Sequence, residues 1–315
     1  MKYQPIDLAR VTTYPIAGRR NKVSLASDFA GEISAGMSVS ALLAAMPNRL
    51  GSESLNALID AVVKARDKGK PVVIGIGGHV IKCGLQPVLK KLIAADIITA
   101  VAMNGSATIH DYEISLIGET SEDVGAVLHC GTFGMAEETG RDINRALKEG
   151  VNEGLGYGEA LGRFIVRNDN PHRESSLLAT CFDKGIPATV HVAVGTDIIH
   201  QHPDCDGAVL GQATFTDFRI FTSVVSTLGG GGVFINIGSA VIMPEVFLKA
   251  LSIAQNMGFH VDAFTTANFD MTQHYRPLQN VVKRPTAGDS RGLTVTGHHE
   301  IMIPLLAAGI LDRLR

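Results

Sequence analysis

The sequence predicts an α/β protein with a doubly wound, mostly parallel, Rossmann-like sheet, and three observations predict this fold. Strand-like apolar runs alternate with helical patterns over most of the 315 residues, which is typical of parallel sheets with helical crossovers. Several strand-like runs end in glycine-rich turns, where such sheets approach nucleotides. The core is also mostly aliphatic, because 45% of the residues are hydrophobic and only 5% aromatic, as in sheets that helices cover on both faces.

We expect one α/β domain over residues 1–315, opening with an arm of about residues 1–20 that lacks periodicity. The first βαβ unit carries most of the evidence for the fold, and Pro87 should kink its helix or delay the helix start. In chain order, the expected elements are a helix over 55–68, a strand over 72–76, a helix over 80–95, a strand over 97–103, helices over 136–150 and 175–184, a strand over 188–194, a helix over 214–228, a strand over 233–237, a helix over 244–258, a strand over 260–265, and a strand, a turn and a helix over 294–314.

Capping and turn residues set several of these boundaries. Gly185 and Pro187 end the helix that begins near residue 175, since glycine favours the residue after a helix and proline cannot continue one. Pro244 suits a first helical turn, and the carboxylate of Glu245 there complements the helix dipole. The four glycines Gly229–Gly232 lead into the strand over 233–237.

Composition excludes several classes of partner. The net charge of -3 gives no electrostatic basis for binding nucleic acid. No apolar run is long enough to span a membrane, and the first residues lack the apolar core of a signal peptide. The 4 cysteines are scattered without paired spacing, which favours reduced thiols in a cytoplasmic protein over disulfides or a zinc site.

Two glycine turns follow the first two strands of the βαβ unit. They read Gly77-Gly78-His79 and Asn104-Gly105-Ser106. The first is not the dinucleotide-binding pattern GxGxxG, and its glycines also fit tight packing of strand against helix. The ends of adjacent parallel strands share one crevice, however. The two turns together therefore favour a nucleotide cofactor.

A second group of residues could bind metal or move protons. His200, His202, Asp204 and Asp206 alternate along one segment, and residues two apart in an extended chain point the same way. They could form a metal site, and a metal-dependent hydrolase is one alternative function. A polar loop that closes a strand explains the same residues without a ligand.

Two basic segments near the end of the chain are further candidates. Lys283 lies in an irregular stretch, where a buried lysine with a lowered pKa could act as a Schiff-base nucleophile; a surface lysine is the simpler interpretation. His298-His299-Glu300 precedes the terminal helix and fits a helix-start cap.

Seven runs along the chain carry a family resemblance through their order and spacing, which are more specific than any one run. The runs are Ile81-Lys82-Cys83-Gly84-Leu85-Gln86, Ala102-Met103-Asn104-Gly105-Ser106 followed by Ile109-His110-Asp111, Arg173-Glu174-Ser175-Ser176, Ile186-Pro187-Ala188, Ala193-Val194-Gly195-Thr196-Asp197, Phe234-Ile235-Asn236-Ile237-Gly238-Ser239 and Ile303-Pro304-Leu305-Leu306. With these runs, the chain from about Lys70 to its end resembles the deoxyhypusine synthase family.

The resemblance implies NAD as cofactor and an amine or polyamine as substrate. In the family, NAD accepts a hydride from spermidine, an enzyme lysine captures the aminobutyl group as an imine, and an acceptor amine receives it; related bacterial proteins make homospermidine. Carried over, Asp197 would hold the amine, His298 or His110 would shuttle protons, and Lys283 would be the nucleophile. The implied cofactor-binding residues are Gly77, Gly78, His79, Asn104, Gly105, Ser106, Gly238 and Ser239. Family active sites sit at subunit interfaces, so the resemblance also implies a homo-oligomer, a tetramer.

The chain departs from the family at the residues that carry its chemistry. The family's acidic pair after the second glycine turn is replaced by Ile109-His110. The family's Trp-Gly-Lys nucleophile motif is absent, because the chain has no tryptophan. Keeping Arg276-Pro277 in register places the family lysine at Pro285, two positions from Lys283. These departures leave open a second alternative, a non-catalytic regulatory protein that binds NAD or another nucleotide.

Overall fold

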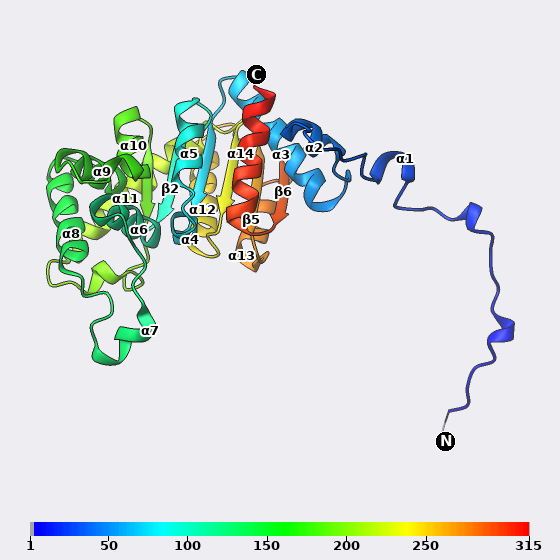
Figure 1. The fold of residues 1–315 in the computed structure, drawn as a ribbon, viewed down its shortest axis with the longest axis horizontal. Coiled ribbons are helices and arrows are strands. Elements are labelled where there is room, and N and C mark those ends of the chain that lie inside the picture. The colour runs from blue at the N-terminus through cyan, green and yellow to red at the C-terminus, as the bar shows by residue number, and fades with distance from the viewer. Residues whose placement is uncertain (1–2, 315) are drawn as a thin grey trace.

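A six-stranded parallel sheet forms the centre of the structure, a computed structural model that describes residues 3–314 (Figure 1). The strand order is β3-β2-β1-β4-β5-β6, the doubly wound Rossmann order in which the chain reverses direction across the sheet between β1 and β4. The predicted Rossmann-like α/β fold is therefore confirmed. The strands are β1 Val72–Ile76, β2 Ala100–Asn104, β3 Ala188–His191, β4 Val233–Ile237, β5 Thr265–Asp270 and β6 Arg291–Thr296.

The central strands are buried on both faces. Every residue of β1 and β4 is buried, and Gly75 stands in register with Ala102 on one side and Asn236 on the other. A Cβ on Gly75 would lie 3.1 Å from the ring of Phe234, which stacks on Phe247 at 4.0 Å between ring centroids. The aromatic rings thus fill the space that the glycine leaves free, in an otherwise aliphatic sheet.

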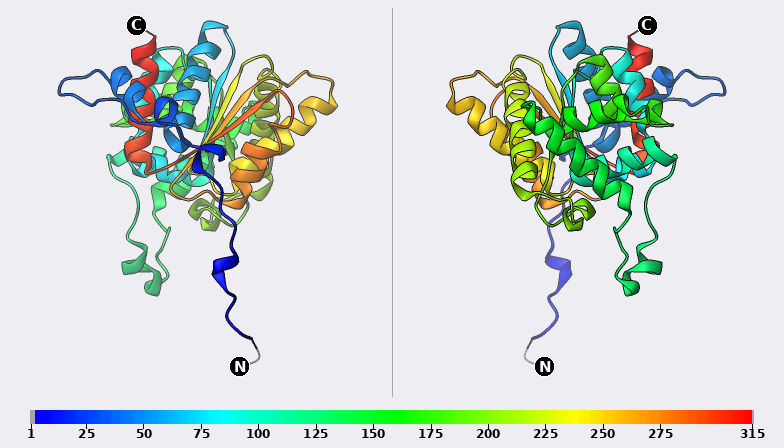
Figure 2. Two further views of the ribbon diagram at one scale, coloured as in Figure 1. Left: turned by 90° about the vertical axis from the view of Figure 1, so that its right-hand side faces the viewer. Right: turned by 90° about the vertical axis from the view of Figure 1, so that its left-hand side faces the viewer.

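Helices cover both faces of the sheet (Figures 1 and 2). One large core cluster contains buried residues of α2 Val39–Ala45, α3 Leu50–Asp67, α4 Gly78–Lys82, α5 Gln86–Ala94, α6 Gly105–Ile117, α8 Glu137–Asn152, α9 Tyr157–Arg167, α10 Leu177–Lys184 and α14 His299–Arg313. A second cluster contains buried residues of α11 Gly207–Val225, α12 Ile242–Asn256 and the π-helix η6 Leu278–Lys283, which follows α13 Tyr275–Pro277. Short elements occupy the connections: η1 Leu8–Arg10, η2 Ile16–Gly18, α1 Leu25–Asp28, α7 Val124–Val127, η3 Leu128–Cys130, η4 Arg173–Ser175 and η5 Ile198–Gln201.

Several elements differ from the expectation: α6 was not expected, and three further differences have physical reasons. The helix expected over 80–95 is two helices, because Gly84 has a φ of 69° and Pro87 lies in the first turn of the second one. The strand expected over 260–265 begins only at Thr265; the apolar residues before it, Val261 and Phe264, are buried in a loop. Helix α9 was not expected, because its start lies in the glycine-rich turn 154–158.

Two segments project from the body toward the carboxyl edge of the sheet, the edge at which the strands end (Figures 1 and 2). One is the arm, which runs away from the body before Lys22, whose carbonyl accepts a hydrogen bond from Arg49. The other is an excursion over residues 119–136 that contains α7 and η3. Among the described residues, no helix has both the length and the apolar character needed to cross a bilayer.

Candidate functional site

The predicted glycine turns meet at the carboxyl edge of the sheet, where β1 and β4 lie side by side. The Gly77 N–H donates to the Ile237 carbonyl at 3.0 Å, and a Cβ on Gly77 would lie 2.2 Å from the Gly238 carbonyl oxygen. Gly238 itself has a φ of 64°, a conformation that favours glycine. The backbones of the two turns therefore touch, which requires a residue without a side chain at position 77.

The turn after β2 closes on the turn after β1. A Cβ on Gly78 would lie 2.3 Å from Ser106 Oγ and 3.2 Å from His110 Cδ2. Asn104 caps α6, its Oδ1 accepting a hydrogen bond from the Ala107 N–H at 3.0 Å, as asparagine does at helix starts. Gly78, Ser106 and His110 are thus neighbours, although the 23 residues 77–99 separate β1 from β2.

Asp197 approaches the same turns from the loop after β3. Its Oδ2 would lie 2.0 Å from a Cβ on Gly105, so the carboxylate packs against the first residue of α6. Its side chain is 8% exposed, and Oδ2 has no hydrogen-bond partner. Burial raises the pKa of Asp197 to about 6. The predicted site residue is therefore a buried carboxylate with a vacant acceptor position.

His200 faces Asp197 from the next turn of the chain. Its Nδ1 accepts hydrogen bonds from the N–H groups of Gly195 and Asp197, at 3.1 and 3.3 Å. This pattern assigns the proton to Nε2, which lies 3.8 Å from Asp197 Oδ2 and has no hydrogen-bond partner. Burial lowers the pKa of His200, so the ring is a neutral donor beside the carboxylate.

His110 is held by a chain of hydroxyl and carboxylate groups. Its Nδ1 lies 2.7 Å from Thr120 Oγ1, which donates to Glu113 Oε2 at 2.5 Å. Thr139 donates to the other oxygen of Glu113 at 3.1 Å. Because the Thr120 hydroxyl proton goes to Glu113, Nδ1 of His110 is the donor to Thr120 and Nε2 keeps its lone pair. Burial, with a smaller effect of Lys82, lowers the pKa of His110 to about 4, so the ring is neutral near pH 7.

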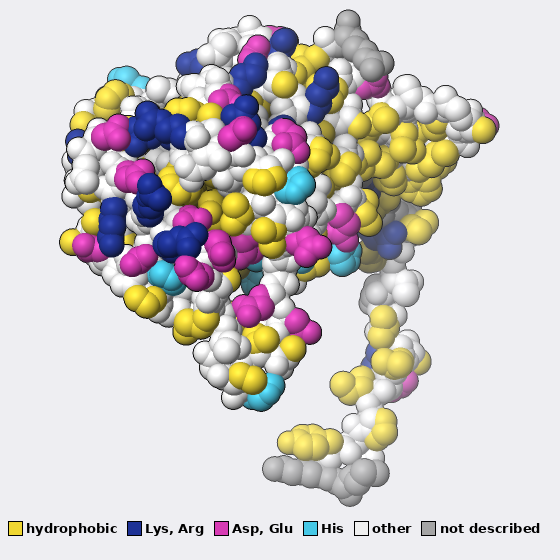
Figure 3. All heavy atoms as spheres, turned by 60° about the vertical axis from the view of Figure 1, so that its left-hand side comes forward, with side chains coloured by type: hydrophobic (Ala, Val, Ile, Leu, Met, Phe, Trp, Pro, Cys, Tyr) yellow, Lys and Arg dark blue, Asp and Glu magenta, His cyan; other side chains and the backbone are white. Residues whose placement is uncertain are grey.

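Of these groups, His110, Glu113 and Asp197 line one cavity of about 250 Å³. Ser106, His110 and Asp197 come from the predicted site, and Lys82 and Glu113 join them. The excursion over 119–136 forms one wall, and acidic side chains gather where it leaves the body (Figure 3). No sequence pattern predicts that Lys82 lines this cavity or that Thr120 donates a hydrogen bond to Glu113. Both depend on how the excursion folds back over α6.

The histidines before the terminal helix lie on the β4 side of the crevice. His298, the predicted proton shuttle, is the N-cap of α14, and its side chain is 62% exposed. His299 is 2% exposed, its Nδ1 has no hydrogen-bond partner, and its Nε2 would lie 2.6 Å from a Cβ on Gly238. Its ring centroid is 5.9 Å from that of His79. The sequence could not separate these adjacent histidines, and the buried one contacts the glycine turn.

Lys283 does not converge with the other predicted residues within one chain. It ends η6 and is exposed. The residues just before it lie against the amino ends of β5 and β6: the Val281 carbonyl accepts from Thr266, and the Val282 carbonyl would lie 2.0 Å from a Cβ on Gly292. The glycine turns are at the carboxyl ends. Within one chain, Lys283 therefore lies away from the cofactor turns, because η6 carries the chain from one edge of the sheet to the other.

The proposed metal segment divides into separate structural roles. His200 faces Asp197, whereas the His202 ring packs against Gly140, and Asp206 caps α11 through the N–H groups of Ala208 and Val209. Within residues 3–314, no group of three or more His, Cys, Asp or Glu side chains could hold a metal ion. The metal-centred alternative therefore has no site in the described part of the chain.

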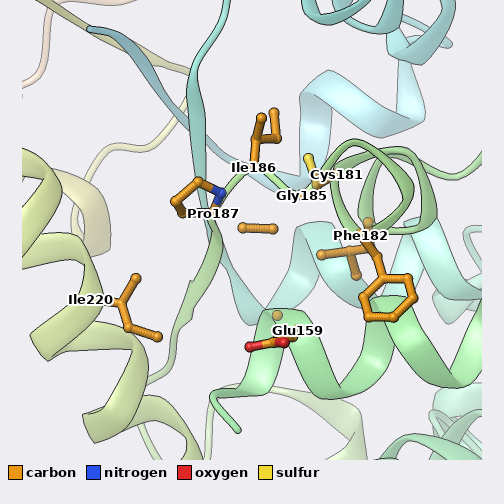
Figure 4. A pocket seen from close by; sticks show the side chains of 10 residues that line it. Glu159, Cys181, Phe182, Gly185, Ile186, Pro187 and Ile220 are labelled. Carbon is orange, nitrogen blue, oxygen red and sulfur yellow. The ribbon is translucent and has the colours of Figure 1, made fainter.

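A second cavity lies at the other edge of the sheet, away from the glycine turns. Its volume is about 270 Å³, and it borders Pro187 and Ala188, where β3 begins. Figure 4 shows mostly apolar side chains around it, with Glu159 as the charged group among those labelled. Burial raises the pKa of Cys181 in its wall, so this thiol is a poor nucleophile.

The carboxyl edge is compatible with a dinucleotide, with one departure from the usual pattern. Gly77, Gly78 and Gly105 are buried against other protein atoms, and His299 contributes a buried ring nitrogen without a hydrogen-bond partner. The end of β2 carries Asn104, a helix cap, where many dinucleotide-binding proteins have an acidic residue for the ribose. Ser239 is also occupied structurally, since its Oγ accepts from the Met243 N–H at 3.1 Å. Among the predicted cofactor residues, His79 is exposed, and Asn104, Ser106 and Gly238 are partly exposed.

Comparisons with solved structures identify the class of fold. No family model and no curated protein sequence matches the chain. Among solved structures, the ternary complex of AgrE with ornithine and NAD+ superposes with a TM-score of 0.53 at 15% identity, over 85% of this chain and 35% of AgrE. ArgZ, an arginine dihydrolase from the ornithine-ammonia cycle in Cyanobacteria, gives 0.51 at 15% identity, over 85% and 34%. The chain thus spans about a third of the length of these two proteins.

A third neighbour has a length similar to that of this chain. A candidate deoxyhypusine synthase from Entamoeba histolytica gives a TM-score of 0.52 at 11% identity, over 88% of this chain and 94% of its own. At these identities the likeness establishes the shared Rossmann-like fold. The family resemblance of the sequence thus has a structural counterpart at the level of the fold.

Proposed function

We propose that the protein is a deoxyhypusine synthase-like, NAD-dependent enzyme that oxidises an amine at the carboxyl edge of its sheet. The observation that carries this proposal is the cavity in which neutral His110 and the unpartnered carboxylate of Asp197 stand beside the glycine turns of β1 and β2. Perturbed ionisable groups that converge in a cavity are typical of active sites.

Each residue of the cavity has a role in this proposal. When bound, NAD would supply the hydride acceptor for the carbon that carries the amine. Asp197 would hold the substrate ammonium, which provides the donor that Oδ2 lacks. His110 Nε2 would accept a proton, and Thr120 and Glu113 would keep the ring in the tautomer with the proton on Nδ1. The backbone at Gly77, Gly78 and Gly238 would approach the cofactor.

The neighbours support the cofactor at the level of the fold. The AgrE structure holds NAD+ together with ornithine, and the Entamoeba protein is a candidate deoxyhypusine synthase. The position of Lys283 favours limiting the proposal to amine oxidation, because the covalent aminobutyl transfer of the family needs a lysine beside the cofactor. A non-catalytic NAD-binding protein is the second candidate, and the same lysine position favours it.

We also propose that the chain forms a homo-oligomer, as its family resemblance implies. Five large apolar side chains of the arm, Ile6, Leu8, Val11, Tyr14 and Ile16, are 62% to 86% exposed. An apolar groove of about 370 Å³ lies between α11 and α12. Exposed apolar surface of this kind marks association. Light scattering should show an oligomer for the full-length protein and a smaller oligomer or a monomer after removal of the arm up to residue 21. A monomeric full-length protein would contradict the proposal.

The test of the catalytic proposal is direct. Purified protein is incubated with NAD+ and a panel of amines, including spermidine, and NADH formation is followed by absorbance. We expect NADH formation, and we expect His110→Ala and Asp197→Asn to lower it strongly. Binding of NAD+ without turnover of any amine would instead support the regulatory protein. Failure to bind NAD+ would contradict both.

A further inference from the structure

We propose that the substrate is an amino acid, whose carboxylate pairs with Lys82 and whose ammonium group pairs with Asp197. This inference rests on the proposed amine oxidation and names its substrate class. It is carried by the charges that face the cavity, and in particular by a lysine that the catalytic proposal leaves without a role.

Lys82 is a cation without a carboxylate partner. It is the last residue of α4 and lines the cavity with His110 and Asp197. No carboxylate of residues 3–314 forms a salt bridge with it within 4.0 Å. Its side chain is exposed, and its charge is the smaller of the two causes, after burial, that lower the pKa of His110. An anionic ligand group would pair with it.

The carboxylates of the cavity are not equally available. Both oxygens of Glu113 accept hydrogen bonds from threonine hydroxyls. Glu122 accepts from the Gly134 N–H at 2.8 Å. Asp197 alone among these three has a buried oxygen without a hydrogen-bond partner in the described structure. The cavity therefore offers a cation without a salt-bridge partner and a buried carboxylate oxygen without a donor, and a zwitterion could pair with both.

Lys82 is the group that would distinguish an amino acid from a simple diamine. The carboxylates of Glu113, Glu122 and Asp197 line the same cavity and attract the ammonium groups of either ligand, whereas only the amino acid has a carboxylate to pair with Lys82. The remaining wall includes the apolar residues Ile109, Val124 and Phe133, which suit the side chain of an amino acid. A volume of about 250 Å³ is just below the range of about 300–1,000 Å³ for drug-sized ligands, so a small substrate is favoured.

The oxidation balances with groups that the proposal names. The Cα–H bond breaks, its hydrogen and electron pair pass as hydride to NAD+, and a C=N bond forms to the amine nitrogen. One ammonium proton leaves through His110 Nε2. NAD+ is reduced to NADH and the amino acid is oxidised to its iminium ion, which water can hydrolyse to a 2-oxo acid and ammonium.

The test uses pairs of probes that differ only in the carboxylate. Ornithine is compared with putrescine, and lysine with cadaverine, by calorimetric titration without NAD+ and by NADH formation with it. Lys82→Gln is the variant, and Lys91→Ala on exposed α5 surface is the control. We expect each amino acid to bind more tightly than its diamine. Lys82→Gln should weaken amino-acid binding by about 10-fold or more, the value of one charged hydrogen bond, and leave diamine binding equal or stronger.

The outcomes separate this inference from the proposed function. Diamines that bind as well as the amino acids, or a Lys82→Gln variant with an unchanged preference, would overturn the inference. Oxidation of diamines but of no amino acid would overturn the inference and still support the proposed amine oxidation. Amino-acid binding that depends on Lys82, without NADH formation, would support an amino acid as the ligand and overturn the proposed amine oxidation.

Discussion

Asp197→Asn should stabilise the folded protein at neutral and higher pH, although it removes a proposed active-site group. Burial raises the pKa of Asp197 to about 6 from its ordinary value of 3.8. The folded state therefore binds this proton more tightly than the unfolded chain. The stabilisation from this proton is complete below pH 3.8 and is lost as the pH rises through 6.

The magnitude follows from the two pKa values. At 1.36 kcal/mol per pKa unit, the raised pKa of Asp197 lowers the unfolding free energy by about 3 kcal/mol at pH 8. At pH 4, where the folded protein keeps this carboxyl protonated, the loss is only about 0.6 kcal/mol. Asparagine carries no charge and still caps the turn at η5, since it is a good N-cap residue. The variant should therefore gain up to about 3 kcal/mol in unfolding free energy at pH 8, and the gain should shrink as the pH falls.

Urea denaturation of the wild type and the variant at pH 8, 6 and 4 measures this gain. Asp204→Asn is the matched control, because it removes the same charge from a side chain that is 50% exposed in the same loop. Its effect should stay within about 0.5 kcal/mol. An Asp197→Asn effect that is absent or independent of pH would refute the reasoning. It would mean that the N-terminus of α6, which Asp197 contacts, offsets the burial of the charge.

Three further predictions follow from the same geometry. His110→Ala should lower NADH formation by about 10²–10⁴-fold with little change in the binding of the amine, as separate rate and binding measurements would show; equal losses in both would indicate a binding role. Gly77→Ala should destabilise the protein by about 1–3 kcal/mol, because its Cβ would lie 2.2 Å from the Gly238 carbonyl oxygen, whereas Gly51→Ala, with nothing within 4 Å, should be neutral or stabilising in the same melting assay. Lys283→Ala should leave amine oxidation unchanged, and a large loss would show that the lysine reaches a site in another copy of the chain.

The sequence predicts the sheet and the meeting of the glycine turns for one physical reason. Parallel strands all end at the same edge, so turns that follow successive strands must converge there. The strands over 72–76 and 233–237 were predicted with their observed bounds. The 260–265 segment was misplaced because Val261 and Phe264 are buried in a loop, and burial alone does not distinguish a loop from a strand.

The side chains around the turns were less predictable. Asp197 was selected from its family context, but its burial against Gly105 depends on contacts between distant segments. The roles of Lys82 and Thr120 depend on an excursion that has no sequence pattern of its own. Lys283 was selected by its distance along the chain from a family motif, and a π-helix then carries it to the opposite edge of the sheet. The position of a residue along the chain does not show which edge of the sheet it will lie at when it belongs to a crossover between strands.

The most direct test of the account is NADH formation on mixing the purified protein with NAD+ and each amine of the panel, with His110→Ala as the comparison. The account predicts NADH formation with at least one amino acid, and its loss in the variant. NAD+ bound to a folded protein that forms no NADH with any amine would contradict it.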